Sequence, residues 1–141
     1  MKKKYLIIIA NYYEDIANGL LDSALKLIPK SNIIKIIKVP GVFEIPVTIS
    51  KNIKKYDAFL ALGCVIKGET PHFDFISQAS TSAIMDLSIS NQKPIGNGII
   101  TCLNMRQAKA RKKKGAEAAQ AVISILSQKW ELILTQKIIL E

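Results

Sequence analysis

Short, nearly continuous runs of isoleucine, valine and leucine alternate along this sequence with longer segments in which apolar residues recur at helical spacing. The apolar runs cover residues 5–10, 33–39, 58–66 and 95–101. Helical spacing covers residues 13–27, 44–55 and 73–90, a segment from about Met105, and residues 116–129. Strands that are apolar on both faces need helices on both sides, which is typical of a parallel sheet. With right-handed crossovers, this order predicts an α/β protein, a three-layer α/β/α sandwich around a four-stranded parallel sheet.

Two of the expected strands differ in character, and the difference predicts their places in the sheet. Residues 58–66 are the most apolar and should form a central strand. Residues 33–39 include Lys35 and Lys38, which favours a position at the sheet edge or at a subunit interface.

The chain has 141 residues, 49 % of them hydrophobic, which suits a single domain with a substantial core. It contains no internal repeat or linker-like stretch, so we expect one domain over residues 1–141, the form of residues 130–141 being left open. No apolar run approaches the ~18 residues that a membrane-spanning helix requires, and the start of the chain does not resemble a signal peptide. We therefore expect no membrane partner.

The two cysteines, Cys64 and Cys102, lie far apart and lack the spacing and the histidine partners of a zinc site. We expect neither a disulfide scaffold nor a bound metal, and we expect a reduced, cytoplasmic compartment.

The net charge of +9 raises the possibility of nucleic-acid binding. However, 18 of the 20 basic residues are lysine, and isoleucine occurs 24 times, as a codon bias that fills solvated positions with lysine would produce. Charge balance of this kind affects non-specific association, and we expect no nucleic-acid partner.

In parallel sheets of this type, ligands bind outside the carboxyl ends of the strands, here residues 11–13, 40–44, 67–74 and 102–104. The third exit holds His72, the only histidine, which can carry a proton near neutral pH while Asp74 or a backbone carbonyl sets its tautomer. The alternative is a surface histidine at the start of a helix. Residues 68–70, just before that helix, offer backbone amides and a hydroxyl to an anion.

The other exits also allow two interpretations each. Phe43 and Glu44 are either a core aromatic and a first-turn acid or an aromatic face and a carboxylate in a binding site. Tyr12 and Tyr13 either pack at a helix entry or offer a stacking surface for a flat heterocycle. The basic segment 106–114 is either a solvated helix face or a phosphate contact.

Three segments carry a family resemblance when they are considered together: VPGVFEIP at residues 39–46, GCVIKGETPHFD at residues 63–74 and KGAEAA at residues 114–119. They resemble the signature segments of the 6,7-dimethyl-8-ribityllumazine synthase family, and the resemblance extends from the first strand to about Leu126. It implies a flavodoxin-like fold and condensation of 5-amino-6-(D-ribitylamino)uracil with 3,4-dihydroxy-2-butanone 4-phosphate, releasing phosphate and water, in riboflavin synthesis. It also implies that neither a metal nor a cofactor takes part.

The resemblance assigns roles to individual residues. His72 matches the proton-transfer residue, Tyr12 an aromatic that stacks on the pyrimidine, and Phe43 and Glu44 the ribityl side. Arg111 and Lys114 match residues that reach the phosphate from a neighbouring subunit. The remaining candidate substrate-binding residues are Val65, Lys67, Gly68, Glu69, Thr70 and Asn97.

This sequence departs from the family pattern at several positions. Lys67 replaces a common arginine, Pro71 a serine or threonine, and Asn97 a phenylalanine, while the stretch from Arg111 to Gly115 is shorter than in many members.

The resemblance further implies small-molecule substrates and a homo-oligomer, either a pentamer or several pentamers, whose channel is lined by the Ser/Thr-rich helix 73–90. Riboflavin synthase is a candidate partner. The archaeal type of riboflavin synthase is the main rival, but it lacks the T-x-H-x-D pattern around His72. A non-catalytic flavodoxin-like module that binds acidic partners through residues 112–114 is the other rival.

Overall fold

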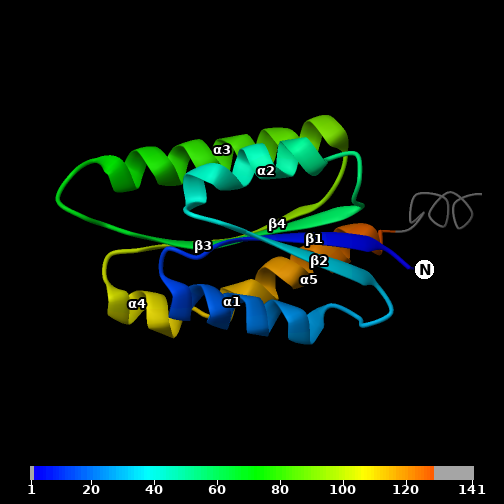
Figure 1. Ribbon diagram of the computed structural model, residues 1–141, viewed down its shortest axis with the longest axis horizontal. Helices are drawn as coiled ribbons and strands as arrows, with labels where there is room; N and C mark the ends of the chain where they lie inside the picture. Colours follow the sequence, from blue (N-terminus) through cyan, green and yellow to red (C-terminus); the bar gives the residue numbers. More distant parts are fainter. Residues whose placement is uncertain (1, 129–141) are drawn as a thin grey trace, which may run out of the picture.

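The computed structural model describes residues 2–128. Four parallel strands form one sheet in the order β2-β1-β3-β4, with β1 (Lys4–Ala10), β2 (Ile33–Val39), β3 (Ala58–Ile66) and β4 (Ile95–Cys102). Helices α2 (Ile45–Asn52) and α3 (His72–Asn91) cover one face, and α1 (Glu14–Leu27), α4 (Met105–Ala110) and α5 (Lys114–Leu126) cover the other (Figure 1). The predicted α/β/α sandwich with a four-stranded parallel sheet is confirmed.

The order of the strands confirms both predicted positions. Strand β3 lies between β1 and β4 and is buried along its length except at its last residue, Ile66. Strand β2 is an edge strand, and Lys35 and Lys38 are exposed on it. The chain adds β2 on one side of β1 and then β3 on the other side, so the order of the strands reverses between β1 and β3. The crevice outside the carboxyl ends of these two strands is the place where such a fold binds ligands.

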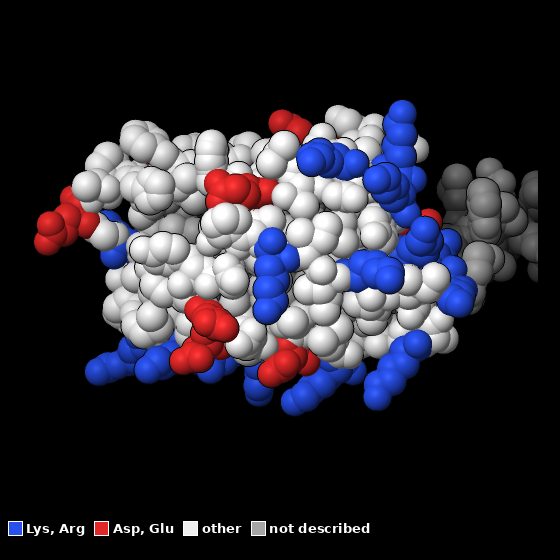
Figure 2. All heavy atoms as spheres, viewed as in Figure 1, with Lys and Arg blue, Asp and Glu red and all other residues white. Residues whose placement is uncertain are grey.

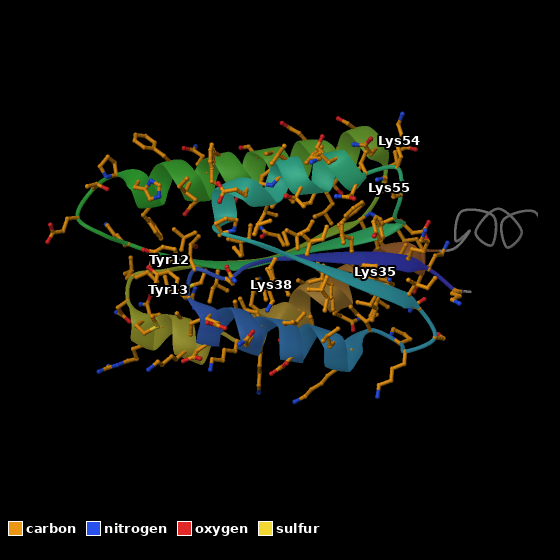
Figure 3. All side chains as sticks on the ribbon, in the orientation of Figure 1. Tyr12, Tyr13, Lys35, Lys38, Lys54 and Lys55 are labelled. Carbon is orange, nitrogen blue, oxygen red and sulfur yellow. The ribbon has the colours of Figure 1, made fainter. Side chains whose placement is uncertain are left out.

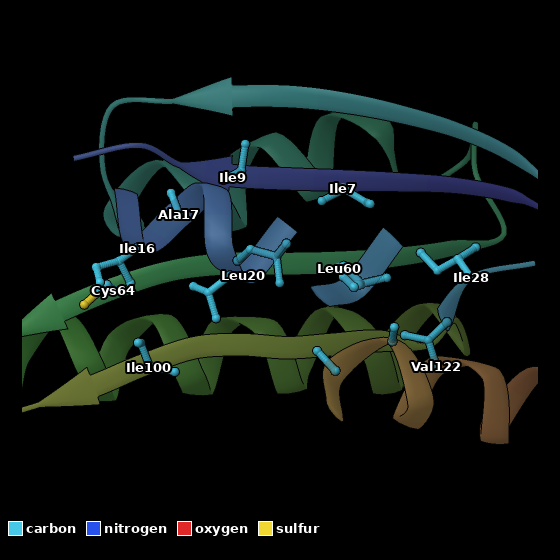
Figure 4. Close-up of a cluster of buried hydrophobic side chains, with 14 of the residues drawn as sticks. Ile7, Ile9, Ile16, Ala17, Leu20, Ile28, Leu60, Cys64, Ile100 and Val122 are labelled. Atoms are coloured by element: carbon cyan, nitrogen blue, oxygen red, sulfur yellow. The ribbon is translucent and has the colours of Figure 1, made fainter. Parts of the chain in front are cut away.

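The sheet separates two apolar cores. One core packs β1, β3 and β4 against α1, α4 and α5, with Ile7, Leu20, Leu60 and Val122 near its centre (Figure 4). The other core joins the opposite face of the sheet to α2 and α3. Strands with both faces buried therefore support helices on both sides.

Charged side chains stay outside these cores. Figure 2 shows lysine and arginine side chains along the lower rim and the right-hand end of the molecule, with acidic side chains between some of them. In the described residues, no helix combines the length and the apolarity needed to cross a membrane.

Glycines allow α5 to approach its neighbours closely. A Cβ at Gly96 or Gly98 would collide with the backbone or side chain of a neighbouring element, including Ala118 of α5. Gly115, in the first turn of α5, lies against the Leu20 carbonyl of α1, where a Cβ would have no room. These contacts set the position of α5 over β4 and α1.

Gly115→Ala is therefore expected to lower the free energy of unfolding by about 1–3 kcal/mol, the usual effect of overpacking, even though alanine is the better helix former. Urea unfolding monitored by circular dichroism would measure this loss. Gly68→Ala is the control, because a Cβ at Gly68 meets nothing within 4 Å. Equal midpoints for Gly115→Ala and Gly68→Ala would contradict the packing argument.

The structure corrects two predicted helix boundaries. Residues 44–55 do not form one helix, because a short 3-10 helix η1 (Val42–Glu44) precedes α2, and turn hydrogen bonds from Ile53 and Lys55 follow it. Helix α5 begins at Lys114 rather than at residue 116, so Lys114 belongs to the helix and not to the preceding loop.

Candidate active site

Three of the four strand exits meet in one cleft of about 490 Å³. The cleft lies at the carboxyl ends of β1 and β3, where the order in which strands are added to the sheet reverses. Five of the predicted site residues line it: Tyr12, Phe43, Glu44, Val65 and His72. Sequence reasoning did not assign a binding role to Cys64, Ile66 or Ile76, which also line it. Their apolar character indicated burial, but nothing in the sequence indicated which apolar residues of β3 and α3 face a cleft.

Tyr12 and Tyr13 form an edge-to-face pair, with ring centroids 4.9 Å apart and planes at 78°. Tyr12 is 75 % exposed, whereas Tyr13 is half-buried and packs on the apolar core. Figure 3 shows both tyrosines beyond the carboxyl end of β1. Lys35, Lys54 and Lys55 lie at the opposite end of the molecule. The exposed Tyr12 ring is thus available for stacking, and Tyr13 supports it.

The phenol of Tyr13 is not suited to act as a base. Burial, together with the neighbouring Tyr12 and Cys64, raises its pKa above the usual value. It therefore stays protonated at neutral pH.

The structure argues against the purely structural interpretation of Phe43 and Glu44. Phe43 is 63 % exposed, so it is not a core residue. Glu44 ends η1 and precedes α2, so it is not a first-turn acid of that helix. The Glu44 N–H donates a hydrogen bond to the Gly41 carbonyl at 3.2 Å, which closes the turn of η1 that carries both side chains beside the cleft.

His72 is the first residue of α3 and is exposed, which suits both a surface helix start and a proton carrier. Its backbone N–H lies 3.4 Å from Thr70 Oγ1, and no hydrogen bond within residues 2–128 links its imidazole to Asp74. The loop 67–70 is exposed and does not line the cleft. Its first residue, Lys67, is attached to the sheet by an N–H bond to the Cys102 carbonyl at 2.9 Å.

Asn97, Arg111 and Lys114 line a second hollow, of about 640 Å³, beside the exposed edge of β4. Thr81, Thr101 and Lys113 also face this hollow, and it shares no lining residue with the first cleft. Asn97 Oδ1 accepts a hydrogen bond from the Ile99 N–H at 3.1 Å. One chain therefore presents the predicted site residues as two separate groups, with the loop 67–70 exposed beside them.

Both cysteines are free and buried, and in the described part of the chain no three His, Cys, Asp or Glu side chains gather as metal ligands. Burial raises the pKa of the Cys64 thiol to about 12, with a further contribution from Cys102. Burial also raises the pKa of Cys102, although Arg111 opposes this shift. Arg111 thus lies close enough to the carboxyl end of β4 to affect a thiol there.

This shift predicts a loss of stability at alkaline pH. The unfolded chain releases the Cys64 proton near pH 9 and the folded chain near pH 12, so stability falls between these values by about 1.4 kcal/mol per pH unit. Urea unfolding at pH 8, 9 and 10 should show a steeper decline for the parent protein than for Cys64→Ala. Parallel declines would show that Cys64 is not responsible.

Known proteins of one family resemble this chain along most of its length. The family model described as 6,7-dimethyl-8-ribityllumazine synthase matches residues 2–129. The chain belongs to this family. A relative of that name from Agrobacterium fabrum is 41 % identical over 146 residues, covering 94 % of this chain and 99 % of the relative. Another, from Methylorubrum populi, is 43 % identical over 139 residues, with 89 % and 82 % covered.

Membership of the lumazine synthase family confirms the resemblance carried by the three signature segments. The matched residues include the first cleft, the loop 67–70 and the basic segment before α5. The protein is accordingly a transferase of riboflavin biosynthesis.

Proposed function

We propose that this protein condenses 5-amino-6-(D-ribitylamino)uracil with 3,4-dihydroxy-2-butanone 4-phosphate to give 6,7-dimethyl-8-ribityllumazine, phosphate and water. The observation that carries the proposal is the cleft shared by Tyr12, Phe43, Glu44, Val65 and His72. It combines exposed aromatic rings for a flat heterocycle with a carboxylate for hydroxyl groups and an imidazole for proton transfer.

Each lining residue has a role in this proposal. Tyr12 stacks on the pyrimidine, Val65 packs beside it, and Phe43 and Glu44 contact the ribityl chain. The amine of the pyrimidine attacks the ketone to form an imine, phosphate leaves, and the ring closes after proton transfers. His72 moves protons in these steps. Holding two substrates in register can contribute about 7 to 11 kcal/mol, so positioning matters more than any single acid or base.

The phosphate group binds to residues from two chains in this proposal. Gly68, Glu69 and Thr70 approach it from the chain that supplies the cleft, with Lys67 beside them. Arg111 and Lys114 approach it from the next chain, and Asn97 lies with them along the β4 edge. The separation of the two hollows on one chain supports this division, because the basic group shares no lining with the aromatic one.

A site shared in this way requires an oligomer, and we expect a homopentamer or an assembly of pentamers. Exposed apolar side chains on η1, α2 and α3, namely Phe43, Val47, Phe75, Met85 and Ile89, offer surface for such contacts. An apolar groove of about 410 Å³ runs between α2 and α3. Light scattering at micromolar concentration should give a mass that is a multiple of five chains, and a monomer would contradict this expectation.

Mixing purified protein with the two substrates tests the proposed reaction. The lumazine chromophore and free phosphate should appear together in equal amounts. Formation of riboflavin from the lumazine would instead support the riboflavin synthase alternative, and the absence of both products would favour a binding module.

A further inference from the structure

A single hydroxyl on α1 holds the short basic segment between α4 and α5. The hydroxyl of Ser23 lies 2.8 Å from the Lys112 carbonyl oxygen and 3.0 Å from the Leu20 carbonyl oxygen. It donates its proton to these two acceptors. The same oxygen accepts a hydrogen bond from the Ala116 N–H at 3.0 Å. Ser23 thus contacts the basic segment before α5 and the first turn of α5 at the same time.

The attachment divides the basic side chains into two kinds. Lys112 is half-buried, and its aliphatic stem covers Gly19, where a Cβ would collide with it. Arg111, Lys113 and Lys114 are exposed and line the hollow beside β4. Lys112, which accepts the hydrogen bond from Ser23, is therefore the anchored residue, and its basic neighbours face the hollow.

Anchoring of this kind matters because long basic side chains lose conformational freedom when they bind an anion. Fixing the backbone on which they stand reduces the part of that cost that falls at the moment of binding. Without the Ser23 hydroxyl, the Ala116 N–H loses its acceptor, and the Lys112 carbonyl keeps only the longer bond, of 3.4 Å, from the Gly115 N–H.

We propose that Ser23 is a positioning residue for the phosphorylated substrate, because it fixes the segment that presents Arg111, Lys113 and Lys114. This inference rests on the proposed function, in which that segment reaches the phosphate. Ser23 does not itself touch the substrate.

The test measures steady-state kinetics of the assembled protein with each substrate varied in turn. Ser23→Ala should raise KM for the phosphorylated substrate by about 3- to 10-fold, the range expected for loss of one hydrogen-bonding group. The KM for the pyrimidine substrate and kcat should stay within twofold. The Ki of inorganic phosphate as a competitive inhibitor should rise in parallel.

Ser88→Ala is the matched control, because Ser88 Oγ likewise joins a helix to a carbonyl, that of Lys93, at 2.7 Å. It should change neither KM nor the Ki of phosphate. If Ser23→Ala does not assemble, the pair Ser23→Thr and Ser23→Val replaces it, since these side chains have similar shapes and only threonine keeps the hydroxyl. The Ser23→Thr variant should then have a lower Ki for phosphate than the Ser23→Val variant.

A double substitution distinguishes the positioning role of Ser23 from the phosphate contact proposed for Arg111. In an Arg111→Ala background, Ser23→Ala should have a smaller effect on KM, because one of the side chains it positions is missing. If Arg111→Ala leaves KM for the phosphorylated substrate unchanged, the proposed phosphate site is wrong. If Arg111→Ala raises KM but removing the Ser23 hydroxyl does not, only the role of Ser23 is overturned.

Discussion

Replacement of His72 by alanine is expected to lower kcat by about 10² to 10⁴ while the assembled protein stays folded. His72 lines the cleft at the start of α3 and is exposed, so its removal leaves the core intact. A positioned acid or base contributes a factor of this size, whereas a surface helix-start histidine contributes none to turnover.

The measurement is steady-state formation of the lumazine chromophore at saturating substrate, with circular dichroism and light scattering to verify fold and assembly. Asp74→Asn is a useful companion, because Asp74 lies on the same first turn but does not line the cleft. It should retain far more activity than His72→Ala. A kcat for His72→Ala within twofold of the parent would refute the proton-transfer role.

Mixed oligomers of His72→Ala and Arg111→Ala chains are expected to be more active than the average of the two parent variants. The structure places His72 in the first cleft and Arg111 in the hollow beside β4. In the function proposed above, two adjacent chains therefore complete one site. Some sites in a mixed oligomer then combine an intact His72 with an intact Arg111 from the neighbouring chain. In the pure Arg111→Ala protein, the main effect should be a higher KM for the phosphorylated substrate, since a charge-assisted contact contributes about 1.5 to 3 kcal/mol.

The two variants would be unfolded together and reassembled, and mass spectrometry would verify that the chains have mixed. Separately reassembled variants, combined afterwards, provide the control for losses during refolding. If thoroughly mixed oligomers show only the average activity, each site lies within one chain and Arg111 has no role across the interface.

Much of the fold follows from local patterns in the sequence. The apolar runs predict the strands because burial on both faces requires apolar residues at every position, as β3 shows. Lys35 and Lys38 indicated the edge position of β2 because a central strand has no solvent for a charged side chain. The motifs around Phe43 and His72 identified the family, because their residue order is specific without any knowledge of contacts.

Helix ends were predicted less well, because they depend on contacts from outside the helix. Helix α5 begins earlier than its apolar pattern, since the Ser23 hydroxyl of α1 accepts a hydrogen bond from its first turn. Conversely, α4 carries a local signal: Asn104 Oδ1 accepts from the Gln107 N–H, and Gln107 Oε1 accepts from the Leu103 N–H. Such reciprocal capping depends only on residues close in sequence.

Sequence alone determined which residues are unusual and that they follow the strands, because residue type and spacing are local properties. Only the tertiary structure decided how these residues are grouped. It exposes Phe43 beside Tyr12, assigns Arg111 and Asn97 to a separate hollow, and joins Ser23 to Lys112. These relations depend on strand order and on the close approach of α1 and α5, which arise from packing between segments far apart in the chain. No periodicity within a single segment encodes them.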